Sequence, residues 1–201
     1  MQEPARLILM YLVFPLWVAA GFADWACHRR TGIAYTSGLK ENLLHLLMAA
    51  QIGSGLAAVA LLEINAAVLL LVLLLFITHQ LTVYWDLHYS TMLRDVGPFE
   101  QMVHSFLEIL PLLALALLCV IAWPQAQALV GRGEAPAEWT LQLKQEPLPP
   151  RYLLAALAAL LAFNVLPLLQ ETWSCVRARP KSRPGKARKA TARTPPNPGP
   201  R

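Results

Sequence analysis

Five long apolar runs, separated by shorter polar segments, dominate the hydrophobic pattern of the chain. They cover approximately residues 7–27, 39–62, 66–87, 99–123 and 152–173. Each is close to the ~20 residues that an α-helix needs to cross ~30 Å of hydrocarbon at ~1.5 Å per residue. The first run is longer than the apolar core of a typical signal peptide, so we interpret it as a mature helix. The pattern predicts an all-α, polytopic membrane protein.

Composition supports the membrane class. Of the 201 residues, 56% are hydrophobic and only 14% are charged, whereas soluble domains carry roughly 25% charged residues. Cys27, Cys119 and Cys175 are scattered, with no Cys-x-x-Cys pair. The cysteines therefore indicate neither a disulfide framework nor a zinc knuckle.

The charge is concentrated at the C-terminal end. Nine Lys or Arg and no acid occur from Arg177 to Arg201, and the remaining eight basic and twelve acidic side chains give a net charge of −4. We expect residues 177–201 to form a disordered basic tail, because they lack the apolar residues that a folded core needs. Attraction to anionic membrane lipids, worth ~1 kcal/mol per basic residue, is favoured over nucleic acid binding, since the tail has no interleaved aromatic residues.

The distribution of basic residues predicts the orientation. With five crossings, the tail shares one face of the membrane with the turns after the first and third runs. The positive-inside rule then places this face in the cytoplasm and the N-terminus outside, with residues 124–151 as an extracytoplasmic loop. We expect an integral protein of a bacterial inner membrane. The basic residues of the two turns are Arg29, Arg30, Lys40 and Arg94.

Two segments look like copies of one metal-binding hairpin. Each copy pairs an Asp and a His at the end of one apolar run with Glu-x-x-x-His at the start of the next. Four residues along a helix return a side chain to the same face, and all three residue types bind metals. We expect the two hairpins to pack about a pseudo-twofold axis along the membrane normal. The first copy has Asp24, His28, Glu41 and His45, and the second has Asp86, His88, Glu100 and His104.

His79 and Glu108 extend this set deeper into the apolar runs, and the matching positions of the first copy are Trp17 and Ala49. An ionisable group inside a membrane helix costs roughly 2.5–3.5 kcal/mol, so these two side chains need a partner. Shared metal ions would supply one. Two alternatives to metal binding stay open. The polar residues at the helix ends can simply be solvated, or the acids can form an ion-pair network with basic residues. We expect little Lys or Arg for such a network, because Arg94 and the other bases lie in turns.

The ten ligand candidates suit two metal ions. A shell of carboxylates and imidazoles without thiolates favours iron or manganese first, and then zinc. Residues 20–108 thereby resemble, loosely, the di-iron carboxylate four-helix-bundle proteins, although the spacing here is Glu-x-x-x-His rather than Glu-x-x-His. The resemblance implies a four-helix bundle around two irons. The fifth run carries none of the ten residues, so we expect its helix to pack outside the bundle.

These features predict a membrane-embedded di-iron oxidoreductase, a monooxygenase or desaturase that acts on an apolar, lipid-like substrate near the cytoplasmic face. An electron-donor protein would be its partner. A divalent-metal transporter and a metal-binding accessory subunit of a larger membrane complex are the alternatives. Transport is disfavoured, because the outer halves of the first four runs are almost entirely apolar, with only Gln51, Ser54 and Glu63 as breaks.

Overall fold

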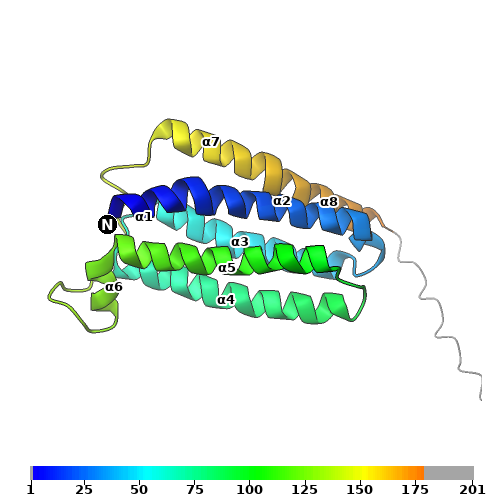
Figure 1. Ribbon diagram of the computed structural model, residues 1–201, viewed down its shortest axis with the longest axis horizontal. Helices are drawn as coiled ribbons and strands as arrows, with labels where there is room; N and C mark the ends of the chain where they lie inside the picture. Colours follow the sequence, from blue (N-terminus) through cyan, green and yellow to red (C-terminus); the bar gives the residue numbers. More distant parts are fainter. Residues whose placement is uncertain (1, 179–201) are drawn as a thin grey trace, which may run out of the picture.

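The computed structural model describes residues 2–178. The first long helix is continuous through α1 (Gln2–Ile8), the π-helical turn η1 (Leu9–Val13) and α2 (Phe14–Thr31). The last is continuous through α7 (Pro150–Leu160), the π-helical turn η3 (Leu161–Val165) and α8 (Leu166–Arg177). The remaining α-helices are α3 (Leu39–Leu61), α4 (Ala66–Thr91), α5 (Pro98–Ile121) and the short α6 (Trp123–Leu129) (Figure 1).

Five helices of the described region are long and apolar enough to cross a membrane, which confirms the predicted all-α class and the number of long apolar helices. The observed helices continue past the predicted runs at one end of the molecule, where α4 reaches Thr91 and α8 reaches Arg177. The predicted disordered tail, from residue 179 onwards, lies outside the described residues.

Local sequence explains several helix ends. Gly32 follows α2 with φ 66°, a left-handed conformation that glycine adopts without steric cost, and its N–H donates to the His28 carbonyl. Asn65 precedes α4, and its side-chain oxygen accepts a hydrogen bond from the Val68 N–H at 3.1 Å. Pro98 is the first residue of α5, a position where the missing N–H is harmless.

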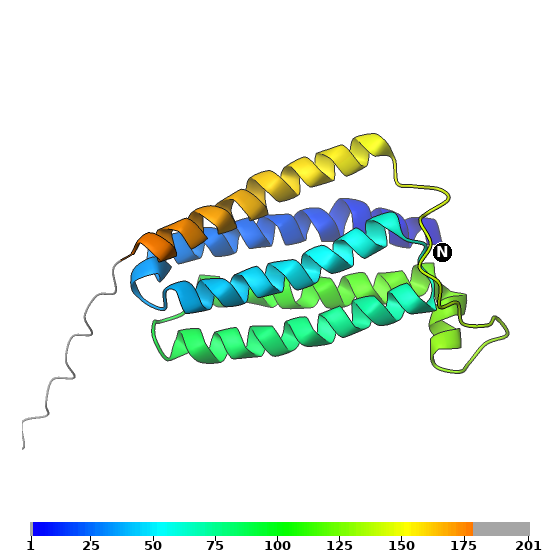
Figure 2. The same cartoon turned by 180° about the vertical axis from the view of Figure 1, so that it is seen from behind.

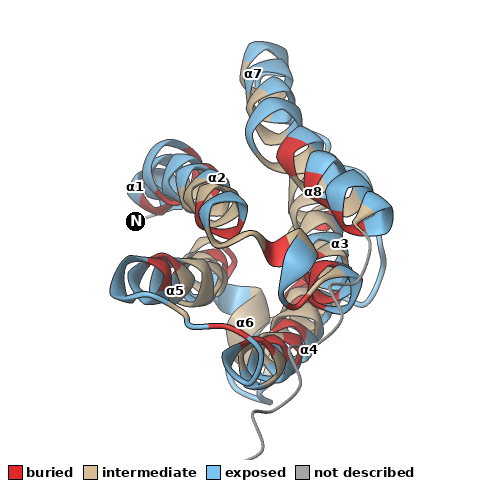
Figure 3. Ribbon diagram, turned by 90° about the vertical axis from the view of Figure 1, so that its right-hand side faces the viewer, coloured by how far each residue is buried: buried red, intermediate tan, exposed pale blue. Residues whose placement is uncertain are grey.

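The five long helices form a ring. Helix α2 packs on α5, α5 on α4, α4 on α3, α3 on α8, and α8 closes the ring against α2 (Figure 3). The expectation that the fifth helix packs outside the bundle is therefore wrong for its second half, because α8 lies between α2 and α3, whereas α7 has no buried residue. A polar contact explains this position of α8. Its residue Glu171 is buried and hydrogen-bonded to His28 of α2 and His45 of α3.

The two ends of the ring differ in polarity. The turns at 32–38 and 92–97 and the end of α8 share one end, whereas the N-terminus and α6 lie at the other (Figure 1, Figure 2). Near that other end, Leu69, Leu118 and Ala122 form a buried apolar core. The buried acids lie towards the turn end; they are Glu41, Asp86, Glu100 and Glu171.

Candidate metal centre

A buried polar cluster fills the ring near its turn end and draws side chains from all five long helices. Aspartate, glutamate and histidine side chains provide most of it, with one asparagine and one arginine. All members are buried except Asp24 and His104, which are partly exposed. The members are Asp24 and His28 on α2, Glu41, Asn42 and His45 on α3, Asp86 on α4, Arg94 in the following turn, Glu100 and His104 on α5, and Glu171 on α8.

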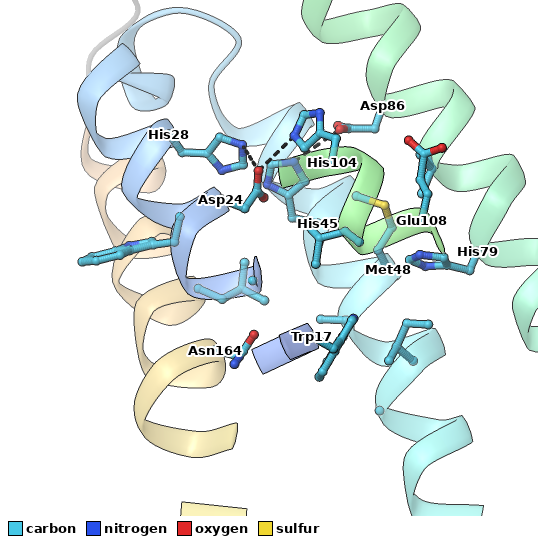
Figure 4. A pocket seen from close by; sticks show the side chains of 18 of the residues that line it. Trp17, Asp24, His28, His45, Met48, His79, Asp86, His104, Glu108 and Asn164 are labelled. Atoms are coloured by element: carbon cyan, nitrogen blue, oxygen red, sulfur yellow. Dashed lines mark ion pairs between the residues drawn. The ribbon is translucent and has the colours of Figure 1, made fainter. Parts of the chain in front are cut away.

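One side of the cluster joins α2 to α5. His104 Nε2 lies 2.9 Å from Asp24 Oδ1. His28 Nε2 lies 3.5 Å from the same Asp24 oxygen (Figure 4). The same nitrogen lies 3.6 Å from Glu100 Oε1. Asp24 and His28 are four residues apart, as are Glu100 and His104, so helical periodicity places both pairs on inward faces. This group therefore brings together four ligand atoms from two helices.

The opposite side joins α3 to α4. His45 Nε2 lies 3.4 Å from Asp86 Oδ2. A carboxylate oxygen of Glu41 lies within 4.8 Å of ligand atoms of both residues. All three side chains are buried. This second group repeats the Asp, Glu and His composition of the first with one imidazole fewer.

Glu171 links the two sides through histidine. Its Oε2 lies 3.1 Å from His28 Nδ1, and its Oε1 lies 3.3 Å from His45 Nδ1. Asn42 Nδ2 also donates to Oε1, at 2.9 Å. Metal-binding histidines commonly donate the N–H of the second ring nitrogen to a carboxylate, which fixes the tautomer. Protonation of both Nδ1 atoms would leave both Nε2 atoms free to bind metal.

Three overlapping groups in the described region could hold a metal ion, since their ligand atoms lie within 4.8 Å of one another. His28 belongs to two of the groups and His45 to two. The shared imidazoles make the groups one continuous centre rather than three independent sites. The groups are Asp24, His28, Glu100 and His104; His28, His45 and Glu171; and Glu41, His45 and Asp86.

Arg94 departs from the expectation that the turn bases would contribute little to an ion-pair network with these acids. Its side chain is only 3% exposed, and its Nη2 lies 2.7 Å from Glu41 Oε1 and 2.6 Å from Glu100 Oε1. Burial disfavours its charged form, but the hydrogen bonds to Glu100 and Glu41 raise the pKa of Arg94 above its usual value. Arg94 therefore stays cationic and joins α3 to α5. It neutralises only part of the acidic charge.

The charge of the cluster favours a bound cation. In formal charges, its five carboxylates and one guanidinium sum to four negative charges with neutral imidazoles, and to one with all three imidazoles protonated. Buried charge without compensation is strongly unfavourable. Several buried atoms also have no hydrogen-bond partner among the described residues, including Asp86 Oδ1, His28 Nε2 and His104 Nδ1. Open lone pairs of this kind suit metal coordination, so the residues present fit a metal site.

The structure brings seven of the ten candidates together and leaves three aside. His79 on α4 is buried but lies outside the three groups. Glu108 on α5 is partly buried and also lies outside them. His88 is exposed, with its ring stacked on Tyr84 at a centroid distance of 6.3 Å. It lies two residues from Asp86, or ~200° around the helix, so both cannot face inward.

Sequence reasoning missed Glu171, Asn42 and Arg94. The available signal for Glu171 was its position within the last apolar run. An ionisable group inside a membrane helix is energetically costly and needs a partner, which is the argument that singled out Glu108. Asn42 lies next to Glu41 in the first Glu-x-x-x-His, where an amide gives no specific signal. Arg94 gave no sequence signal, because the direction in which a turn side chain points depends on the folded conformation of the turn.

A cavity of about 230 Å³ adjoins the cluster and extends between the helices towards the middle of the ring (Figure 4). Asp24, His28, His45, Asp86, His104 and Glu171 line its polar end. Deeper in the ring its walls are mostly apolar and include Trp17, Met48, Ile52, Leu160 and Val165. The centre can therefore be approached from an apolar space inside the ring.

No protein-family model, curated protein or solved structure matches this chain.

Proposed function

We propose that this protein is a membrane-embedded oxidoreductase that uses two metal ions, in the first instance iron, to hydroxylate or desaturate an apolar, lipid-like substrate. The observation that carries the proposal is the excess of buried carboxylates around three imidazoles, beside an apolar cavity. Oxygen-rich shells completed by imidazole suit iron and manganese, with zinc as a further candidate.

The geometry supports two ions on either side of the paired imidazoles. Asp24, Glu100 and His104 would hold one ion together with His28 Nε2. His45 Nε2, Glu41 and Asp86 would hold the other. Glu171 would orient both imidazoles through their Nδ1 atoms rather than bind metal. Arg94 competes for Glu41 and Glu100, so those two carboxylates would turn away from the guanidinium, or be shared with it, when metal binds.

The chemistry requires an external reductant. In hydroxylation, dioxygen, two electrons and two protons convert a C–H bond to C–OH and release water. In desaturation, the same inputs remove two hydrogen atoms from adjacent carbons and release two water molecules. An electron-donor protein on the cytoplasmic side would supply the electrons. The residues of this chain would hold the metals, and the apolar cavity would exclude water from the reacting centre.

The proposal includes an orientation in a bacterial inner membrane, with the turn end and C-terminus in the cytoplasm. We also propose that the hairpins α2–α3 and α4–α5 arose by duplication of one ancestral hairpin. In support, the pairs α2–α5 and α4–α3 are equivalent under a twofold relation between the hairpins, and both are packed. At the remaining edge, α8 packs against both α2 and α3.

Transport of a metal ion is less well supported, because a buried apolar core lies near the opposite end of the described helices. Leu69, Leu118 and Ala122 form the buried core there, with Val59 and Val72 packed around them. A transported cation would have to pass this core without ligands.

Metal analysis of protein purified in detergent without chelator tests the proposal. We expect about two iron ions per chain, reduced in His104→Ala and in Asp86→Asn. His88→Ala is the matched control, because His88 is exposed and outside the cluster. Cells that produce the wild-type protein should contain lipids with one additional oxygen atom or two fewer hydrogen atoms, and cells with His104→Ala should not. Protein without metal, or with equal metal in all variants, would contradict the proposal.

A further inference from the structure

The cavity beside the cluster has two unlike walls. On the α4 and α5 side it is lined by His79 and Glu108, and on the α2 and α3 side by Trp17 and Ala49. These residues occupy matching positions of the two hairpins. One hairpin therefore presents hydrogen-bonding groups to the cavity where the other presents apolar surface. Such a cavity suits an apolar molecule with a polar group on one side.

His79 is the most specific feature of this cavity. It is 6% exposed, and neither of its ring nitrogens has a hydrogen-bond partner among the described residues. A neutral imidazole offers one donor and one acceptor. Buried polar groups in proteins nearly always have partners. A ligand hydroxyl group can donate to one ring nitrogen or accept from the other, whereas a hydrocarbon can do neither.

The position of His79 also sets the length of the ligand. His79 and Asp86 are seven residues apart on α4, which is ~10 Å along the helix axis. Figure 4 shows His79 farther into the ring than Asp86 and the imidazoles of the cluster. A molecule bound to His79 can therefore extend an apolar portion of roughly this length towards the cluster.

We propose that the cavity binds an amphiphile, such as a long-chain alcohol, with its hydroxyl group at His79 and its apolar end at the cluster. This inference deepens the proposed function, because the apolar end would be the part that is oxidised, ~10 Å from the hydroxyl group. The binding step itself requires neither metal nor turnover and can be measured alone.

Gly53 gives a way to close the cavity. It lines the cavity on α3, and a Cβ added there would meet no heavy atom within 4 Å. A side chain at this position therefore has room at its Cβ, and Gly53→Leu is the substitution chosen to reduce the cavity. Gly55 is the matched control on the same helix: a Cβ there would make ordinary contact with Leu75 Cδ1 at 3.8 Å, and Gly55 does not line the cavity.

The experiment is photolabelling of the full-length protein in lipid nanodiscs with a diazirine derivative of 1-decanol, in competition with 1-decanol or n-decane. We expect labelled peptides from α3, α4 and α8, and about tenfold stronger competition by the alcohol than by the alkane, the effect of one added hydrogen bond. His79→Phe should retain labelling but remove this preference, and His79→Asn should restore part of it. Gly53→Leu should suppress labelling, whereas Gly55→Ala should not.

Equal competition by alcohol and alkane in the wild-type protein would overturn the inference, even if a variant fails to fold. Unchanged labelling in a folded Gly53→Leu protein would also overturn it, since the probe would then bind elsewhere. The outcome is separable from that of the proposed function. Selective alcohol binding to a protein without metal would keep the binding site and reject the oxidoreductase, whereas metal and oxidised lipid without alcohol selectivity would reject this inference alone.

Discussion

His28 and His45 lie face to face in the centre of the ring, with ring centroids 4.5 Å apart and planes 4° apart. They come from different helices, α2 and α3, and Glu171 of the intervening α8 contacts the Nδ1 atom of each. Two stacked imidazoles that were both protonated would repel each other. Two neutral rings held by one carboxylate can instead present both Nε2 atoms to metal ions.

Glu171→Gln tests this arrangement. An amide oxygen can accept a hydrogen bond, but the adjacent NH₂ cannot, so one imidazole would lose its acceptor and its fixed tautomer. Loss of a carboxylate behind metal-binding histidines typically weakens metal affinity by about 10–100-fold. We expect an effect of this size in competition titrations against a chelator. Ser174→Ala, at an exposed position of the same helix, should titrate as the wild type does. Equal affinities would show that Glu171 does not orient the metal ligands.

Arg94→Met should destabilise the protein strongly. Removal of the guanidinium leaves Glu41 and Glu100 buried without their partner, and loss of one partner of a buried ion pair costs about 3–5 kcal/mol. Added divalent metal should restore part of the loss, because it supplies the missing positive charge. Thermal unfolding in detergent, with and without metal, measures both effects. Arg30→Met, at an exposed position in the last turn of α2, is the control and should change little.

Lys144 gives the fold a dependence on pH at the opposite end of the molecule. Its Nζ donates to the carbonyl oxygens of Val59 at 2.6 Å and Leu62 at 2.8 Å, where α3 ends. Burial lowers the pKa of Lys144 from 10.5. The unfolded chain therefore binds more protons than the folded chain between the lowered pKa and 10.5, so stability should rise with pH through this window.

Chemical denaturation at a series of pH values approaching 10.5 measures the effect. In Lys144→Met the rise attributable to this lysine should disappear. Lys40→Met is the control, because Lys40 is exposed at the turn end. An unchanged pH profile in Lys144→Met would contradict the assignment.

The hydrophobic pattern was sufficient to predict the long helices, because the length of a membrane span is encoded in the local sequence. The spacing of Asp24 and His28, and of Glu100 and His104, was sufficient to place these side chains on common helix faces. The rotation and packing order of whole helices are not local properties. For that reason the insertion of α8 into the ring could not be deduced, although the position of Glu171 in an apolar run did indicate that this acid needs a partner.

Arg94 shows a different limit. A turn residue is expected to be solvated, and only the folded turn directs this side chain inward between Glu41 and Glu100. His88 shows the converse, since a repeated motif suggested a role that the rotation of α4 does not allow.

The internal counter-ion of the cluster also bears on how such a protein matures. Because Arg94 pairs with both Glu41 and Glu100, the contact between α3 and α5 in this cluster has a positive partner that belongs to the chain itself. If the cluster binds metal as proposed, the ion would then be added to helices that Arg94 already holds together.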